Sequence, residues 1–304
     1  MIDYQQVLED IHTELLGIED TGKVASYIPE LASVSQDNFG IYLNRIKGDN
    51  YCVGDWDTRF SVQSISKVLS LAKALSEVGT SIWNRMDVEP SGDPFNHLSL
   101  LEMEEGIPRN PLINAGAIVV ADILISELSD PKKDFLTYVR GLANDETIIY
   151  NERVAASEKA TGFKNYATAY LLKSFGNLNN PVDEVLDFYF HQCALEMNCE
   201  QLSNAFYLFA NRGKCMRNVP HLTLTQVKRI NAIMLTCGFY DEAGEFAFEV
   251  GLPGKSGVGG GIVALLPNEY ILATWAPGLN PKGNSYLGMQ ALERFTTKTG
   301  ASIF

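Results

Sequence analysis

The sequence predicts an α+β fold in which strands from both ends of the chain share one sheet and an all-helical segment is inserted between them. β-rich runs occur at 38–56 and again at 259–277, whereas most residues between these runs follow a helical period. Helical patterns also begin and end the chain, so helices should flank the sheet. We therefore expect a sheet domain from 1–60 and 225–304, an inserted all-helical domain from 61–224, and a ligand site at their junction.

The first elements should be a helix and a pair of strands. The opening segment MIDYQQVLEDIHTELL follows a helical period, and no basic region precedes an apolar run, so no signal peptide is visible. The runs NFGIYLNRI (38–46) and NYCVGDW (50–56) predict paired strands, because the turn-forming residues KGDN connect them.

The middle of the chain is predicted to be helical from Ser61 onward. Pro111 and Pro181 stand near helix starts, and Gly176 and Gly213 stand near helix ends, as helix capping favours. The clearest helical segments are 111–128, 163–176, 181–197, 199–213 and 223–239.

After Gly238 the pattern becomes β-rich again. The runs GGGIVALLP (259–267) and NEYILATWAP (268–277) predict a hairpin, because a Pro-Asn pair separates them. The final segment GNSYLGMQALERFTTKTG (283–300) predicts an amphipathic helix that closes the chain.

Charge and cysteine content argue against several classes of partner and site. The 304 residues carry a net charge of −13, which disfavours nucleic acid and anionic membranes as partners, since both attract basic surfaces. The five cysteines are odd in number and form no C-x-x-C pair, as expected of buried thiols in a reducing cytoplasm. His191, Cys193 and Cys199 lack a fourth ligand at a customary spacing, so we predict no metal site there.

The candidate nucleophile lies in the segment FSVQSISKVLSLAKAL (60–75), which contains the spacing Ser-x-x-Lys twice, as Ser64/Lys67 and as Ser70/Lys73. Several acyl-transferring enzymes use this spacing to place a serine beside its proton acceptor. A chain of this length contains about one such spacing by chance, so the motif requires a second element to support it.

Helical phase separates the two pairs. On a helix that turns about 100° per residue, Ser64 shares an apolar stripe and Lys67 lies at its edge. Ser66, Ser70 and Lys73 fall on the opposite face, which we expect to be solvated. Ser64 also stands near the helix N-terminus, where free N–H groups favour a developing negative charge. The first pair is therefore the candidate site.

The second element is the segment GLPGKSGVGGGI (251–262), which allows two interpretations. A P-loop would need a glycine at position 249, where a glutamate stands, and a helix afterwards, where a strand pattern follows. The alternative is a Lys-Ser-Gly element at 255–257 on a strand, as in penicillin-recognising serine enzymes. Small residues there let the backbone approach a ligand and complete an oxyanion hole. The Ser-Asp-Asn element of β-lactamases is absent.

Longer blocks of sequence resemble one known family, the serine-dependent glutaminases, which share the β-lactamase/DD-peptidase architecture. The blocks follow the family order across nearly the whole chain: YIPELA (27–32), FSVQSISKV (60–68), NPLINAGA (110–117), SEKATGFKN (157–165), TCGFYDEAGEF (236–246), GLPGKSGVGGGI (251–262) and KGNS (282–285). The resemblance departs from the usual family residues at Lys164, Gly254 and Ala276.

The resemblance implies hydrolysis of L-glutamine to L-glutamate and ammonia by a homotetramer without metal or organic cofactor. It implies that Ser64 is the nucleophile, that Lys67 and Tyr240 take part in proton transfer, and that Lys255 supports them. The oxyanion hole is implied at Ser64 and the backbone of Val258. The implied substrate contacts are Tyr27, Gln63, Ser64, Asn114, Glu158, Asn165, Tyr189, Tyr240 and Val258.

The residue types agree with this chemistry. Glu158 can pair with the ammonium of glutamine, while tyrosine and asparagine groups can bind its carboxylate or amide. A lysine base must lose its proton, and both burial and the nearby charge of Lys255 should lower the pKa of Lys67. Two alternatives stay open: a related hydrolase of other amides or β-lactams, and a glutamine-binding protein without catalysis.

Overall fold

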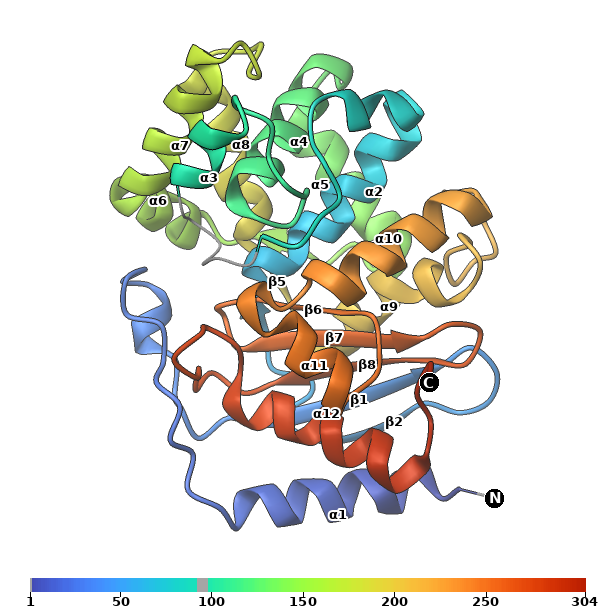
Figure 1. The fold of residues 1–304 in the computed structure, drawn as a ribbon. Coiled ribbons are helices and arrows are strands. Elements are labelled where there is room, and N and C mark those ends of the chain that lie inside the picture. Colours follow the sequence, from blue (N-terminus) through green and yellow to red (C-terminus); the bar gives the residue numbers. More distant parts are fainter. Residues whose placement is uncertain (1, 92–97) are drawn as a thin grey trace.

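The central element is a five-stranded antiparallel sheet in the order β2-β1-β8-β7-β6, seen in a computed structural model that describes residues 2–91 and 98–304 (Figure 1). Strands β1 and β8 come from opposite ends of the chain and pair directly, with Ile41 opposite Thr274. The prediction that both ends share one sheet is thus confirmed. The strands are Gly40–Arg45 (β1), Tyr51–Gly54 (β2), Gly254–Ser256 (β6), Gly261–Leu266 (β7) and Tyr270–Trp275 (β8).

Both faces of this sheet are covered. Along β7, Ile262 packs into the core below the sheet, whereas Val263 packs into the larger core above it. Successive strand side chains point to opposite faces, so coverage on both sides explains why β7 is apolar almost throughout. The two expected hairpins, β1–β2 and β7–β8, are both present.

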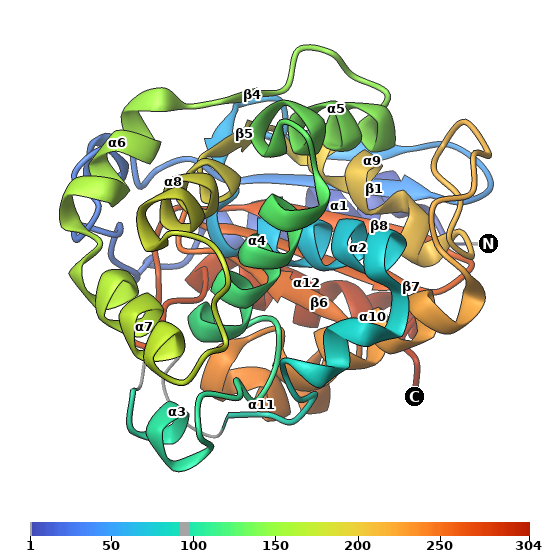
Figure 2. The same ribbon diagram turned by 90° about the horizontal axis from the view of Figure 1, so that it is seen from above.

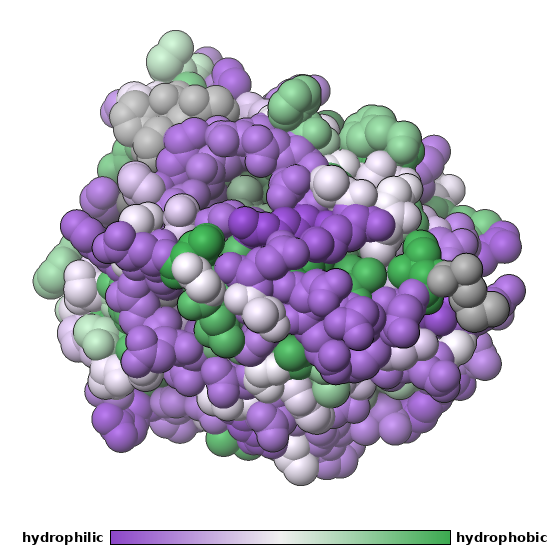
Figure 3. Space-filling model, turned by 90° about the horizontal axis from the view of Figure 1, so that it is seen from below, coloured by the Kyte–Doolittle hydropathy of each residue, from purple (hydrophilic) through white to green (hydrophobic). Residues whose placement is uncertain are grey.

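Three helices cover the lower face of the sheet in Figure 1: Tyr4–Leu16 (α1), Ala243–Glu249 (α11) and Tyr286–Thr299 (α12). Helix α1 packs against α12, so the two ends of the chain lie side by side. Seen from below, this side of the molecule is mostly hydrophilic, with single hydrophobic residues scattered over it (Figure 3). The terminal helices therefore form an outer layer that faces solvent, as their amphipathic patterns predict.

The other helices gather above the sheet around α4, whose residues 115–124 are all buried (Figures 1 and 2). They are Ser66–Val78 (α2), Ser99–Met103 (α3), Asn114–Glu127 (α4), Pro131–Ala143 (α5), Glu152–Thr161 (α6), Phe163–Ser174 (α7), Val182–Cys193 (α8), Cys199–Ala210 (α9) and Leu224–Cys237 (α10). Short 3-10 turns occur at Leu31–Ser33 (η1), Gln63–Ile65 (η2), Gly79–Asn84 (η3) and Tyr240–Glu242 (η4). Among the described residues, no helix is both long and apolar enough to cross a membrane.

A second, three-stranded sheet lies among these helices, in the order β3-β5-β4. Its strands are Phe60–Ser61 (β3), Ile149–Tyr150 (β4) and Leu195–Met197 (β5). The prediction that one helix spans 181–197 was wrong at its end, because helix α8 stops at Cys193. Residues of β5 pair with strands that are distant in the sequence, and this long-range pairing overrides the local helical pattern.

The predicted solvated face of helix α2 was also wrong. Ser66 and Ser70 are both fully buried, because α2 lies against α4, α8 and α10 and is enclosed on several sides. Their hydroxyls donate to backbone carbonyls one turn earlier, Ser70 to Lys67 O at 3.1 Å. Lys73 alone of the three reaches solvent, and it pairs with Glu77.

We expect Ser70→Ala to lower the free energy of unfolding by about 1 kcal/mol, because a buried hydroxyl loses its hydrogen bond. Ser76 provides a matched control on the same helix: it makes the same bond, to Lys73 O at 2.6 Å, but is exposed. Ser76→Ala should leave stability unchanged or slightly higher, since alanine favours helix. Urea denaturation measures both variants. Equal effects at the two positions would contradict the burial argument.

Candidate active site

A cavity of about 570 Å³ lies where the loop after β6 meets helices α4, α6, α7 and α8, the kind of junction that the sequence predicted. Eight of the nine predicted substrate contacts line it: Tyr27, Gln63, Ser64, Asn114, Glu158, Asn165, Tyr189 and Val258. Tyr189 is buried at 2% exposure, whereas Tyr27 is 57% exposed and belongs to the N-terminal segment. Tyr240, the ninth, is buried and meets the cavity through Ser64, as described below.

Ser64 lies in the 3-10 turn η2, immediately before helix α2. The preceding residue, Gln63, has a φ of +51°, a left-handed conformation that non-glycine residues rarely adopt. Such backbone strain concentrates at functional sites, where surrounding contacts hold it in place. The Gln63 side-chain amide supplies such contacts, since it donates to Ser61 Oγ and to Glu158 Oε1, each at 2.9 Å.

The backbone of Val258 is brought against the Ser64 turn by its glycine neighbours. A Cβ on Gly259 would lie 2.1 Å from Ser61 O, and one on Gly257 would lie 2.4 Å from Val62 O. Any side chain at these two positions would therefore force the two segments apart. Val258 N–H donates to no acceptor among the described residues, so it stays available to a ligand in the cavity.

Lys67 is buried at 1% exposure and does not extend to solvent. Its Nζ donates to Asn114 Oδ1 at 2.6 Å and to Leu112 O at 3.3 Å. Burial lowers the pKa of Lys67 to about 8. Asn114 in turn donates to Asn165 Oδ1 at 2.9 Å, so the lysine is tied to two cavity residues.

Tyr240 and Lys255 form a second buried group beside the serine. Burial raises the pKa of Tyr240 to about 12, while a hydrogen bond with Ser64 acts in the opposite direction. Lys255 Nζ lies 4.2 Å from the centre of the Tyr240 ring and donates to Gly238 O at 2.9 Å. The sequence predicted that Lys255 would lower the pKa of Lys67. Burial first and the charge of Lys67 second lower the pKa of Lys255, and because repulsion between two like charges is mutual, this coupling agrees with the prediction.

Glu158 is a buried carboxylate on the cavity wall, at 7% exposure. Burial raises its pKa to about 7, partly offset by the hydrogen bond from Gln63 and the charge of Lys67. A cationic ligand would stabilise the ionised form of this buried carboxylate, because its charge would offset the cost of desolvation.

The chain matches the glutaminase family model over residues 22–304. The chain belongs to the glutaminase family. It is 56% identical to a glutaminase of Christiangramia forsetii and 51% identical to one of Agrobacterium fabrum, in each case over its whole length and at least 99% of the relative.

Solved glutaminase structures also share the fold. A probable glutaminase named ybaS superposes with a TM-score of 0.94 at 33% identity, covering 100% of this chain and 99% of the other. A probable glutaminase from Bacillus subtilis, complexed with 6-diazo-5-oxo-L-norleucine, gives a TM-score of 0.89 at 31% identity, covering 100% and 98%. These matches confirm the predicted β-lactamase-like α+β fold and the prediction of a hydrolase of the glutaminase family.

Sequence reasoning assigned no role to several residues that line the cavity of this glutaminase, among them Thr161, Phe163, Lys164 and Cys193. The first three lie in the block SEKATGFKN, so a closer reading of that block could have suggested them. It also missed a network of Glu242, Asn280 and Asn284: the first and the last lie in family blocks, but nothing in the sequence indicates that they meet. Among the described residues, no group of three or more His, Cys, Asp or Glu side chains could hold a metal ion.

Proposed function

We propose that this protein hydrolyses L-glutamine to L-glutamate and ammonia through an acyl-enzyme on Ser64. The observation that carries the proposal is the placement of Ser64. It opens into the cavity, lies beside the phenol of Tyr240, whose pKa it lowers, and stands one helical turn before a buried lysine. A serine hydroxyl becomes an effective nucleophile only when a nearby base accepts its proton.

In the proposed first step, Ser64 Oγ attacks the side-chain amide carbon of glutamine and its proton passes to the neutral amine of Lys67. The Val258 and Ser64 backbone N–H groups face the oxyanion that forms. The amide C–N bond then breaks, and the leaving nitrogen takes a proton from Tyr240 or Lys67 and departs as ammonia. In the second step, the group that protonated the ammonia takes a proton from water, whose oxygen attacks the ester carbon. The C–O bond to Ser64 then breaks, Oγ takes a proton back from Lys67 or Tyr240, and glutamate leaves.

Substrate recognition is proposed for groups on the cavity wall. Glu158 would pair with the α-ammonium group of glutamine, because it is a buried carboxylate that forms no ion pair with any described residue. The amides of Asn114 and Asn165 would bind the polar ends of the substrate. Lys164 is exposed at the cavity and would attract the α-carboxylate.

Ammonia release from glutamine, compared with asparagine and a chromogenic β-lactam, tests this function directly. Ammonia from glutamine alone is the expected result. Turnover of the β-lactam instead would favour the related hydrolase, to which the Lys-Ser-Gly strand also points. Binding of glutamine without turnover would favour a binding protein.

The activity is expected to rise with pH between 6 and 9. Lys67 acts as a base only when neutral, and with a pKa of about 8 roughly a tenth of it is neutral at pH 7. Glu158 pairs with ammonium only when ionised, which increases through its pKa of about 7. Both fractions grow with pH, so kcat/KM should increase.

A pH series of initial rates measures this profile. Glu158→Gln should raise KM and remove the part of the rise in rate that follows ionisation near pH 7. The rise near pH 8 should remain, since Lys67 is retained. A rate that falls between pH 6 and 8 would contradict the assignment of both groups.

Two further properties are proposed: a homotetramer, from the family resemblance, and a cytoplasmic location, from the cysteines. The five cysteines are all free thiols, four of them buried, which suits a reducing compartment. Light scattering of the purified protein measures the oligomeric state.

A further inference from the structure

The turn that carries Tyr240 contains a buried acid that the proposed mechanism does not use. Tyr240 has a φ of +56°, which is strained for a bulky aromatic residue and persists only where other contacts hold it. Glu242 closes the same turn, with its N–H donating to Phe239 O at 2.9 Å. Its side chain is buried at 8% exposure.

The Glu242 carboxylate receives hydrogen bonds from two asparagines of the loop before helix α12. Asn280 Nδ2 donates to its two oxygens at 3.0 and 2.9 Å, and Asn284 Nδ2 donates to Oε2. Asn280 and Asn284 also bond each other through Asn280 N to Asn284 O at 2.8 Å. All of these contacts come from amide N–H donors, so the Glu242 carboxylate serves as the shared acceptor of the two asparagines.

Asn284 continues the network to the strand that carries Lys255. Its Oδ1 accepts from the Ser256 hydroxyl at 2.5 Å, and the carbonyl of Ser256 accepts from Lys255 Nζ at 2.6 Å. The turn that carries Tyr240 and the side chain of Lys255 both pack around the tyrosine. Glu242 and Asn284 therefore connect them.

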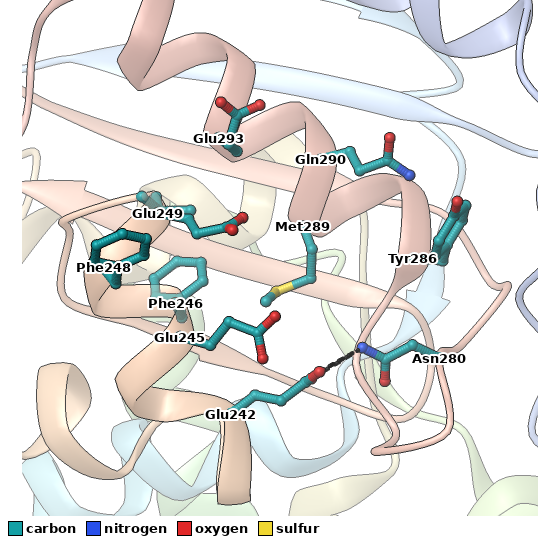
Figure 4. Close-up of a pocket in the computed structure, with 11 residues that line it drawn as sticks. Glu242, Glu245, Phe246, Phe248, Glu249, Asn280, Tyr286, Met289, Gln290 and Glu293 are labelled. Carbon is teal, nitrogen blue, oxygen red and sulfur yellow. Dashed lines mark hydrogen bonds between the residues drawn. The ribbon is translucent and has the colours of Figure 1, made fainter.

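Glu242 does not touch the substrate cavity. It lies at a separate cavity of about 490 Å³ between helices α11 and α12, where it points toward Asn280 (Figure 4). Glu245 lines the same cavity but is exposed. An effect of Glu242 on catalysis must then act through Tyr240 and Lys255.

We propose that Glu242 is a positioning residue that holds the Tyr240 hydroxyl against Ser64 and Lys255 beneath the Tyr240 ring, acting through Asn284. The proposal rests on the proposed function, because it assigns Tyr240 to proton transfer. It predicts a loss of turnover without a loss of glutamine binding, since the cavity wall is left intact.

The test uses Glu242→Gln, which keeps the size of the side chain but replaces one accepting oxygen with an N–H donor, so that Asn280 or Asn284 faces a second donor. We expect kcat for glutamine to fall about 10- to 100-fold, as for a displaced catalytic group, with KM changed less than about twofold. Glu245→Gln is the matched control, because it removes an acid from the same cavity, and it should behave as the wild type.

The double variant Glu242→Gln/Asn284→Asp reverses donor and acceptor across the contact. The carboxylate introduced at position 284 would accept both from the amide introduced at position 242 and from the Ser256 hydroxyl. We therefore expect kcat to recover to within about fivefold of the wild type. Thermal unfolding checks that every variant is folded.

The proposal is overturned if Glu242→Gln keeps full kcat, or if kcat and KM change together with lost stability and the double variant restores nothing. Wild-type turnover of glutamine and loss of turnover in Tyr240→Phe are measured in the same assay. If the wild type does not turn over glutamine and Tyr240→Phe changes nothing, the proposed function is wrong. If they hold and Glu242→Gln is fully active, only the positioning role is wrong.

Discussion

Ser64→Ala should abolish turnover of glutamine while leaving binding of glutamine intact. Without Oγ no acyl-enzyme forms, and removal of a nucleophile of this type lowers kcat by at least about 10⁴-fold, or about 5 kcal/mol of transition-state stabilisation. Binding should persist because Glu158, Asn165 and Tyr189 remain on the cavity wall. Ammonia release measures turnover, and isothermal titration with glutamine measures binding.

The second Ser-x-x-Lys pair supplies the control. Ser70 is buried in helix α2 and its hydroxyl donates to the backbone carbonyl of Lys67, away from the cavity. Ser70→Ala should therefore keep kcat within about twofold of the wild type, despite its expected loss of stability. Full turnover in Ser64→Ala would end the nucleophile assignment, whereas a large loss in Ser70→Ala would show that the two pairs had been confused.

Lys67→Met is expected to cost at least about 10³-fold in kcat, because the serine would lose its base. Methionine fills the space of the lysine stem and suits a buried site, so the protein should stay folded. It leaves Asn114 Oδ1 without its charged donor, which is expected to raise KM modestly. Steady-state kinetics with glutamine, together with thermal unfolding, measures both effects.

Two further variants sharpen this experiment. Lys67→Arg keeps a positive charge but cannot act as a base near neutral pH, so it should be as inactive as Lys67→Met. Activity in the arginine variant would show that charge alone is required. Lys73→Met is the matched control on helix α2, since Lys73 pairs with Glu77 away from the cavity, and it should leave kcat unchanged.

Much of the candidate site was predictable because its signals are short in the sequence. The Ser-x-x-Lys spacing and the Lys-Ser-Gly strand are local patterns, and the family resemblance indicated several of the other residues that line the cavity, among them Tyr27, Glu158 and Tyr189. The local pattern could not predict the burial of Ser66 and Ser70. Considered in isolation, helix α2 has a polar face at these serines, but α4, α8 and α10 cover that face in the folded protein.

The sequence by itself determined the sheet, its two hairpins, most helices and the two candidate catalytic elements, because hydrophobic period and turn residues act over a few positions. Only the tertiary structure decided that 195–197 form a strand, that Ser66 and Ser70 are buried, and that Glu242 meets Asn280 and Asn284. The physical reason is the same in each case. These features depend on partners distant in the chain, and packing against such partners outweighs local preference.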